Sequence, residues 1–389
     1  MEYKKKVQDR VEAIMPDLIV LSDTIWNNPE YNFQEYIACE AFSSLLKKYG
    51  FAVEVGIAGL ETAVKATFSS GKKGPHIGLF GEYDAVPGMG HSCGHNLMAA
   101  MAVGAGEAVK SVIDELGGTV SVFGTPAEEG GGGKVIMLEK GVFDELDVAM
   151  ILHSANETVV NDISYSKTDV IVDFYGVKSH AATFPEEGIS ALTPVLELFN
   201  IINAMRLEIA ERGKILGIIT KGGDEPIFIP DHCQAKFTVR SFDMKFKFEL
   251  LDRLISICQS LASVTNTKFE YKLDGYSYED IRNNPTLEDL LKQNFISLGE
   301  KVMPRRKELG IGCTDMGNVT HEIPGLQSYV QVVPNLRGHT VEFEEAVGGP
   351  EGHKAIKTGA KALAMTAADI LQDAKIYEKI QLDFKDMKL

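Results

Sequence analysis

Short apolar runs alternate with helical segments over the first part of the chain, and this alternation constrains the fold most strongly. Runs that predict strands lie at residues 76–80, 119–123 and 148–152, with helical patterns after Asn96 and over 134–139. Such alternation is typical of a mostly parallel sheet, because each helix carries the chain back to the start of the next strand. The sequence therefore predicts an α/β fold here.

The order of elements changes in the middle of the chain. Between about residues 169 and 275 the order is strand, helix, strand, strand, helix, strand, which is the split βαβ or ferredoxin-like arrangement. The elements predicted there span residues 169–175, 189–208, 214–220, 233–242, 245–265 and 268–273. This segment reads as an inserted α+β domain.

The flanking segments complete the first domain. Two helices fit residues 7–49, while a helix at 285–298, a strand at 327–333 and a closing helix at 351–372 are expected to rejoin the first sheet. A length of 389 residues suits two domains. We expect one domain from residues 1–166 and 278–389, and a second from 167–277.

Charge and hydropathy exclude several classes of protein. The formal net charge is −16 without a long basic run, so no nucleic-acid partner is expected. The longest hydrophobic stretch, residues 97–106, is about half the length of a membrane span, so no membrane helix is expected. The N-terminus lacks an apolar signal core, and five cysteines without a C-x-x-C motif do not predict a disulfide framework. We expect a cytoplasmic protein.

Reactive side chains follow three predicted strands. They supply carboxylates, imidazoles and a thiol, and they are Glu82, Asp84, His91, Cys93, His95, Glu128, Glu129 and His153. The carboxyl ends of parallel strands meet at one edge of a sheet, where ligands bind. Convergence of these residue types there favours a metal site over separate solvated loops.

The spacing of these residues suggests which of them bind metal and which transfer a proton. Cys93 and His95, two residues apart on a glycine-containing turn, can reach a common ion. Asp84 could orient one ligand or bridge two ions. Adjacent Glu128 and Glu129 point in opposite directions in extended backbone, so one can bind metal while the other handles a proton.

Two other motif readings compete with a metal site. A nucleophilic dyad of Cys93 and His95 is the more serious one, although it leaves the paired glutamates without a role. The segment 130–134 looks like a phosphate loop, but Glu128 stands where that loop needs glycine and Val135 replaces its Ser or Thr. We therefore expect no nucleotide site.

Six motifs in chain order span most of the sequence. They are GEYDAVPGMGHSCGHN (81–96), TPAEE (125–129), ILH (151–153), YGVKSHAA (175–182), GGDEPIFIPD (222–231) and GCTDMGN (312–318). Together they resemble the M20 metallopeptidases, in particular the amidohydrolase branch that includes hippurate, auxin-conjugate and aminobenzoyl-glutamate hydrolases. The resemblance implies a zinc-peptidase-like catalytic domain and an inserted lid or dimerisation domain. It also implies a homodimer formed through the lid.

The resemblance implies two divalent ions, zinc before manganese, cobalt or nickel. Their ligands would be Cys93, His95, Glu129, His153 and His339. His339 is preferred to His353 because it precedes Phe343 by four residues, as the family's histidine precedes its phenylalanine. Glu128 would act as general base and then acid, with Asp84 supporting it in the catalytic site.

The inserted domain and the C-terminal part would supply further residues. His180 looks like the lid histidine that polarises the scissile carbonyl, acting from its own chain or from a partner subunit. Arg240 looks like the arginine that binds the substrate carboxylate, a task that suits a bidentate guanidinium, and Asp315 would lie near the metals. The sequence departs from the family at Ile227, where many relatives carry asparagine, and at Glu82, where other branches place a metal-binding histidine.

These features predict an enzyme that cleaves the amide bond of an N-acyl amino acid or short peptide carrying a free carboxylate. Dipeptidase and aminobenzoyl-glutamate hydrolase specificities are the alternatives within this class. A non-catalytic small-molecule binding protein is the alternative outside it. Retention of both glutamates and of every expected ligand type favours the enzyme.

Overall fold

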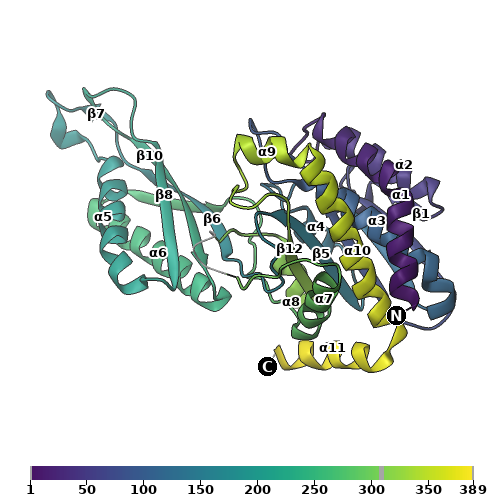
Figure 1. Ribbon diagram of the computed structural model, residues 1–389. Coiled ribbons are helices and arrows are strands. Elements are labelled where there is room, and N and C mark those ends of the chain that lie inside the picture. Colours follow the sequence, from purple (N-terminus) through teal and green to yellow (C-terminus); the bar gives the residue numbers. More distant parts are fainter. Residues whose placement is uncertain (1, 306–310, 388–389) are drawn as a thin grey trace. The chain divides into compact units, whose positions relative to one another are not determined.

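The computed structural model describes residues 2–305 and 311–387. It divides the chain into two compact units (Figure 1). One unit comprises residues 1–163 with 281–389, and the other comprises residues 164–280. Each unit has its own hydrophobic core.

The first unit is built on a six-stranded sheet with the order β1-β2-β4-β3-β5-β12. Its strands are β1 (Ala52–Val55), β2 (Val64–Ser69), β3 (His76–Glu82), β4 (Thr119–Thr125), β5 (Val148–Ala155) and β12 (Gly325–Gln331). The strands β3, β4, β5 and β12 are parallel, while β1 and β2 form an antiparallel edge. The predicted mostly parallel sheet is confirmed.

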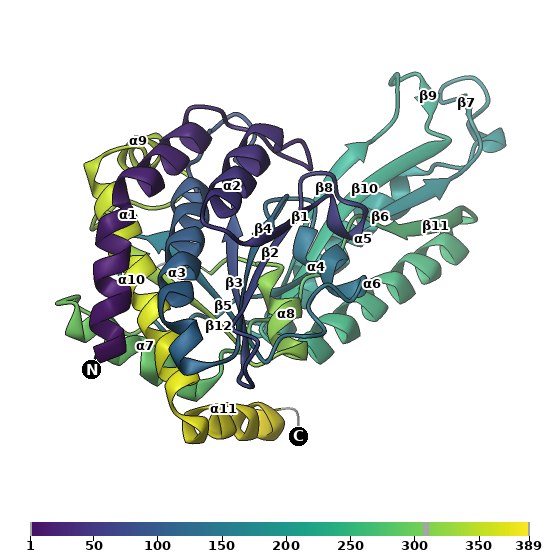
Figure 2. The same cartoon turned by 90° about the vertical axis from the view of Figure 1, so that its right-hand side faces the viewer.

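Helices cover this sheet. They are α1 (Glu2–Trp26), α2 (Tyr36–Lys48), η1 (Ile57–Gly59), α3 (His95–Leu116), α4 (Gly133–Glu139), α7 (Pro285–Ser297), α8 (Met316–Glu322), α9 (Val341–Val347), α10 (Pro350–Gln372) and α11 (Ala374–Met387). Helices α1, α3 and α10 pack side by side on one face, and α4 and α8 contact each other on the opposite face (Figures 1 and 2).

Small residues allow α3 to lie between the sheet and its neighbouring helices. A Cβ added at Gly104 would lie 2.6 Å from Leu18 Cδ1 of α1, and one added at Gly106 would lie 2.3 Å from Val122 Cγ2 of β4. Larger side chains would push these layers apart, because protein cores are close-packed. The N-terminus of α3, which carries His95, is thereby fixed over the sheet.

The second unit has a four-stranded antiparallel sheet with the order β11-β6-β10-β8. Its elements are β6 (Ser166–Tyr175), β7 (Ser179–His180), η2 (Pro185–Glu187), α5 (Leu192–Ile209), β8 (Gly213–Lys221), β9 (Phe228–Ile229), β10 (His232–Ser241), α6 (Met244–Thr265) and β11 (Lys268–Leu273). The predicted ferredoxin-like order is confirmed, with the short β7–β9 pair added to it. Alternate residues of β10 are buried against α5 and α6, as its sequence pattern predicts.

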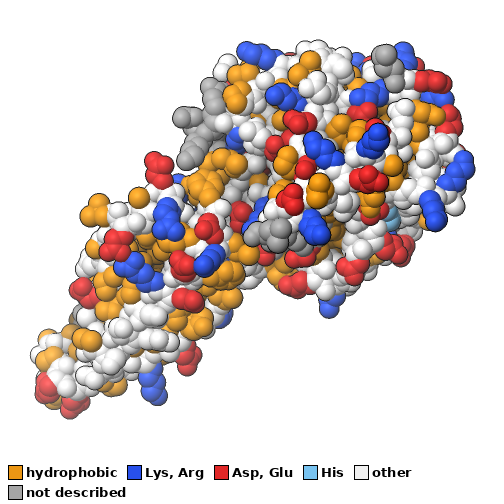
Figure 3. Space-filling view, turned by 90° about the horizontal axis from the view of Figure 1, so that it is seen from below, with side chains coloured by type: hydrophobic (Ala, Val, Ile, Leu, Met, Phe, Trp, Pro, Cys, Tyr) orange, Lys and Arg blue, Asp and Glu red, His pale blue; other side chains and the backbone are white. Residues whose placement is uncertain are grey.

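The distribution of charged and apolar residues bears on the classes of protein that the sequence excludes. On the face drawn in Figure 3, acidic and basic side chains are interspersed rather than gathered into one basic patch. Among the described residues, no helix is both long enough and apolar enough to span a bilayer.

Candidate metal centre

The connection from β3 to α3 presents Cys93 and His95 at the edge of the sheet. Gly94, between them, has a left-handed φ of 79°, which favours glycine. A Cβ at Gly94 would lie 2.1 Å from Ser154 Oγ, and that hydroxyl donates to the Cys93 carbonyl at 2.7 Å. The glycine therefore lets the turn approach β5 closely.

His95 is completely buried between two carboxylates. Its Nδ1 lies 3.0 Å from Asp84 Oδ1 and 2.9 Å from the Asp84 carbonyl oxygen, while its Nε2 lies 3.2 Å from Glu82 Oε2. Burial alone would lower the pKa of His95, but the charges of Cys93, Asp84 and Glu82 raise it well above its usual value. A histidine whose Nδ1–H donates to a carboxylate presents Nε2 to a metal ion.

Asp84 also organises the connection that follows β4. Its Oδ2 accepts from the Glu129 backbone N–H at 3.0 Å. Burial would raise the pKa of Asp84, but the neighbouring His95 holds it below its usual value. One ionised carboxylate thus fixes both the His95 ring and the backbone of Glu129.

Strand β5 brings His153 to the same place. The Cys93 Sγ lies 3.3 Å from His153 Nε2, and His153 Nδ1 lies 2.7 Å from the Ser154 carbonyl oxygen. That carbonyl accepts from Nδ1–H, which leaves Nε2 to face the thiol. Burial, reinforced by His95, lowers the pKa of His153 to about 4, and burial raises that of the Cys93 thiol. A bound cation would favour the neutral imidazole and the thiolate, as metal binding requires.

The paired glutamates follow β4. Glu128 is 8% exposed, and burial together with the charges of Glu82 and Glu129 raises its pKa well above the usual value. Within residues 2–305 and 311–387, Glu129 Oε1 is buried without a hydrogen-bond partner, and it lies 3.5 Å from His339 Nε2. An unpartnered buried carboxylate oxygen is expected where a ligand binds.

The structure separates the two candidate C-terminal histidines. His339 has a left-handed φ of 61°, and its N–H donates to the Ser92 carbonyl at 2.8 Å, which ties it to the loop that carries Cys93. His353 lies on α10, with its Nε2 2.8 Å from Asp23 Oδ1. His339 therefore joins the cluster and His353 pairs with Asp23.

Among the described residues, three overlapping groups have ligand atoms within 4.8 Å of one another. They are Cys93 with His95 and His153, Cys93 with Glu129 and His339, and Glu82 with His95 and Glu128. The first two groups share the thiol. A thiol, three imidazoles and a carboxylate form a donor set that fits zinc and similar divalent ions.

His180 and Arg240 belong to the second unit. His180, on β7, accepts from the Thr183 backbone N–H at Nδ1 over 3.2 Å, so the proton of its neutral ring is on Nε2. Arg240 pairs with Lys167 of β6 and Lys214 of β8 in register, which places three basic residues in one row across the sheet. Within the described residues, Arg240 Nε is buried without a hydrogen-bond partner.

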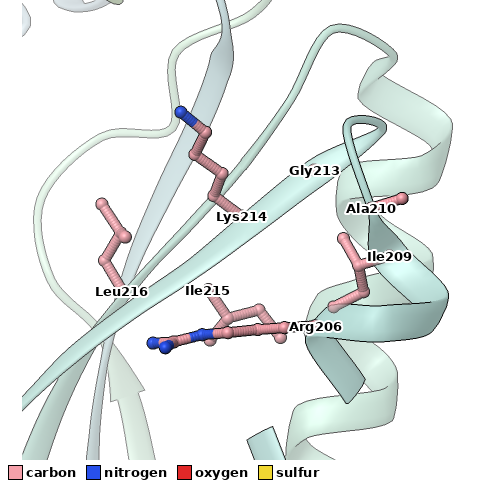
Figure 4. Close-up of a pocket in the computed structure, with 7 residues that line it drawn as sticks. All are labelled: Arg206, Ile209, Ala210, Gly213, Lys214, Ile215 and Leu216. Carbon is pink, nitrogen blue, oxygen red and sulfur yellow. The ribbon is translucent and has the colours of Figure 1, made fainter. Parts of the chain in front are cut away.

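The second unit also has a pocket of about 260 Å³ between the end of α5 and the start of β8 (Figure 4). It is lined by Arg206, Ile209, Ala210, Gly213, Lys214, Ile215 and Leu216. This lining offers neither an acid nor an imidazole nor a thiol, so the pocket does not compete with the cluster in the first unit.

Sequence reasoning missed Lys134. It considered this residue only as part of a phosphate loop, whereas the structure places the Nζ of Lys134 2.5 Å from both Glu82 Oε1 and Asp315 Oδ1. The available signal was a lysine at the start of an apolar helical segment, separated from the glutamate pair by four glycines. Asp315, predicted near the metals, is one of the two carboxylates that pair with this lysine.

Comparison with known proteins identifies the family. The model of peptidase family M20/M25/M40 matches residues 78–369. The chain belongs to this family. It is 32% identical to the human Xaa-Arg dipeptidase over 98% of this chain and 92% of that protein. It is 31% identical to one of the subunits of the Escherichia coli p-aminobenzoyl-glutamate hydrolase over 77% of this chain and 66% of that protein.

A solved structure agrees with this assignment. A dinuclear metal-binding M20 peptidase from Bacillus subtilis has a TM-score of 0.71 at 19% identity, covering 92% of this chain and 99% of that one. The M20 resemblance and the α/β fold with a separate antiparallel sheet are confirmed. The chain is a metal-dependent hydrolase of the M20 family that acts on amide bonds.

Proposed function

We propose that this M20 enzyme hydrolyses a small amide substrate with a free carboxylate by means of two divalent ions. The proposed ligands are Cys93, His95, Glu129, His153 and His339. The observation that carries the proposal is the sharing of Cys93 between two ligand groups, one with His95 and His153, the other with Glu129 and His339. The dinuclear M20 peptidase of similar fold supports two ions.

The identity of the ions follows from the donor atoms. A thiolate with three imidazoles favours zinc before manganese, cobalt or nickel. Bound divalent ions supply a Lewis acid and an activated water nucleophile.

Glu128 is the proposed general base and acid. It belongs to neither of the two groups that share Cys93, yet its carboxyl lies within 4.8 Å of His95. Its raised pKa, caused by burial and by Glu82 and Glu129, suits a group that takes up a proton and holds it for the leaving amine. Asp84 supports catalysis by holding His95 and the Glu129 backbone in place.

The second unit, residues 164–280, is the proposed lid, and the first unit, residues 1–163 with 281–389, is the proposed catalytic domain. The bounds predicted from the sequence were 167–277 for the lid and 1–166 with 278–389 for the catalytic domain. His180 would donate its Nε2–H to the carbonyl oxygen as negative charge develops there, from its own chain or from a partner's. Arg240, with Lys167 and Lys214 beside it, would bind the substrate carboxylate.

A dipeptide is the preferred substrate, with a basic C-terminal residue as the first choice. The similarity to the Xaa-Arg dipeptidases extends over 98% of this chain, which is more than the 77% matched by the aminobenzoyl-glutamate hydrolase chain. Aminobenzoyl-glutamate and N-acyl amino acids are the alternatives.

A homodimer through the lid and a cytoplasmic location complete the proposal. Strand β8 is a sheet edge that exposes Leu216, Ile218 and Ile219, and exposed apolar edges favour pairing with another chain. Cys39, Cys93, Cys233 and Cys258 form no disulfide, which fits a compartment that keeps thiols reduced, such as the cytoplasm.

Replacement of Glu128 tests the proposal. The Glu128→Gln variant should retain two ions per chain and lose at least a hundredfold in kcat, because general acid–base catalysis contributes at least this much. Glu129→Gln is the matched control and should lose metal. Elemental analysis with assays on Xaa-Arg dipeptides, aminobenzoyl-glutamate and N-acyl amino acids measures both effects. A wild-type protein that binds these compounds and releases no product would contradict hydrolysis.

A further inference from the structure

The metal centre has a buried cation beside it that belongs to neither group of proposed ligands. Lys134, the second residue of α4, is 0% exposed. Its Nζ lies 2.5 Å from Glu82 Oε1 and 2.5 Å from Asp315 Oδ1, and its backbone N–H donates to Asp315 Oδ2 at 2.9 Å. One residue therefore links the end of β3, the start of α4 and the residue before α8.

The backbone before Lys134 fixes its direction. Gly132 has a left-handed φ of 69°, and a Cβ added at Gly133 would lie 2.0 Å from the Pro126 carbonyl oxygen. Only glycine fits this close approach of the two sides of the β4–α4 turn. The turn thus directs Lys134 to a defined position in the interior.

The charges around Lys134 explain why a lysine is tolerated there. Burial alone would lower the pKa of Lys134, but Asp315, Glu82 and Glu128 raise it above its usual value, so the side chain is an ammonium. Glu82 is 1% exposed, Asp315 is 0% exposed and Glu128 is 8% exposed. Buried carboxylates need a compensating cation, and Lys134 provides one.

The ammonium occupies a place where a metal ion could bind. It lies between two buried carboxylate oxygens, Glu82 Oε1 and Asp315 Oδ1, and carboxylate oxygens are ligands that divalent ions such as zinc accept. Glu82 and Glu128 also offer carboxylate oxygens within 4.8 Å of each other, beside His95, whose Nε2 is a proposed ligand of the two-ion centre. Without the lysine, the buried carboxylates of Glu82, Glu128 and Asp315 would lie beside the proposed ions with no cation to compensate them.

We propose that Lys134 is a positioning residue that acts as a built-in cation beside the metal centre. It keeps Glu82 and Asp315 ion-paired and unavailable as metal ligands, and so limits each chain to two divalent ions. This inference rests on the two-ion centre of the proposed function.

Metal stoichiometry tests the inference directly. Metal-free Lys134→Met and Lys134→Gln variants are titrated with zinc, freed of unbound metal and analysed for ions per chain. Both should bind three ions where the wild-type protein binds two, and kcat/KM should fall tenfold to a hundredfold as neighbours of the ligands shift. The Gln variant keeps an amide donor for the carboxylates, so it is informative where the Met variant does not fold.

Two further variants distinguish a specific role from a structural one. The double variant Glu82→Gln with Lys134→Met removes both the cation and a carboxylate, so its stoichiometry should return to two. Lys247 is also 0% exposed, and its Nζ donates to Ser277 Oγ at 2.6 Å in the second unit. Lys247→Met should bind two ions, as the wild-type protein does.

The possible outcomes separate this inference from the proposed function. A wild-type protein that binds no ions refutes the two-ion centre and this inference with it. Two ions in the wild-type protein and in both Lys134 variants refute only the role of Lys134. A third ion that persists in the double variant shows that Glu82 is not its ligand, which also contradicts the inference.

Discussion

A single carboxylate, that of Asp84, controls the geometry of the centre at the scale of the residue. Its Oδ1 holds His95 Nδ1 at 3.0 Å, and its Oδ2 holds the Glu129 backbone N–H at 3.0 Å. Asp84 is 1% exposed, so both contacts form away from competing water. The two proposed ligands that it holds, His95 and Glu129, follow different strands, which explains how their side chains reach a common centre.

The two C-terminal histidines give a matched test at this scale. We expect His339→Ala to reduce bound metal from two ions to one, because the group of Cys93, Glu129 and His339 loses a ligand. His353→Ala should keep two ions and near wild-type kcat/KM, since it removes only a part-exposed contact with Asp23. Elemental analysis and steady-state kinetics measure both effects, and loss of metal in the His353 variant would reverse the assignment.

Residue types predicted the members of the proposed metal-binding cluster better than they predicted the residues that surround it. The acids, the thiol, His95 and His153 could be assigned to one edge because each follows a predicted strand, and parallel strands end together. His339 was assigned only through the M20 resemblance. Lys134 could not be found in this way, because lysine is usually exposed and its partner Asp315 lies 181 positions away. Only the folded chain brings the start of α4 against the residue before α8.

At the scale of the element, the turn between β3 and α3 limits what the site can tolerate. Gly94 combines a left-handed backbone with direct contact to β5, whereas Gly88, in the same connection, has a φ of 76° and nothing within 4 Å of an added Cβ. A residue other than glycine would strain the backbone at both positions. Only at Gly94 would its side chain also overlap a neighbouring residue.

This difference predicts unequal effects of the same substitution. Gly88→Ala should lower the free energy of unfolding by about 1 kcal/mol, the usual cost of a left-handed alanine. Gly94→Ala should lower it by about 3 kcal/mol, because overlap with Ser154 adds about 2 kcal/mol to that strain. Urea unfolding of the two variants measures this, and only Gly94→Ala should also weaken metal binding. Equal losses of unfolding free energy in the two variants would mean that β5 moves to make room for the new methyl group.

Hydrophobic periodicity identified the central strands and helices. It missed short strands that form only by pairing with another part of the chain. The strand predicted at residues 76–80 is β3 (His76–Glu82), because a fully buried parallel strand has a continuous apolar run. Strand β1 has four residues, three of them exposed, so it carries no such run. The two-residue strands β7 and β9 are defined only by their pairing with each other. Elements of this kind are set by tertiary contacts.

At the scale of the whole molecule, two separate cores imply that a ligand need not stabilise both units equally. The core of the first unit contains residues from α1 to α11, and that of the second contains residues from β6 to α6. All proposed metal ligands belong to the first unit. Ligand binding stabilises only the cooperative unit that contains the site.

Metal removal should therefore act on one unfolding transition. At free zinc a hundredfold above its Kd, binding adds about 2.7 kcal/mol per site to the stability of the first unit. A chelator should lower the midpoint of that transition in calorimetry and leave that of the second unit unchanged. Glu128→Gln should show the same shift as the wild-type protein, and Cys93→Ser should show a much smaller one because both proposed groups use the thiol. Equal shifts of both transitions would mean that the two units unfold together, in spite of their separate cores.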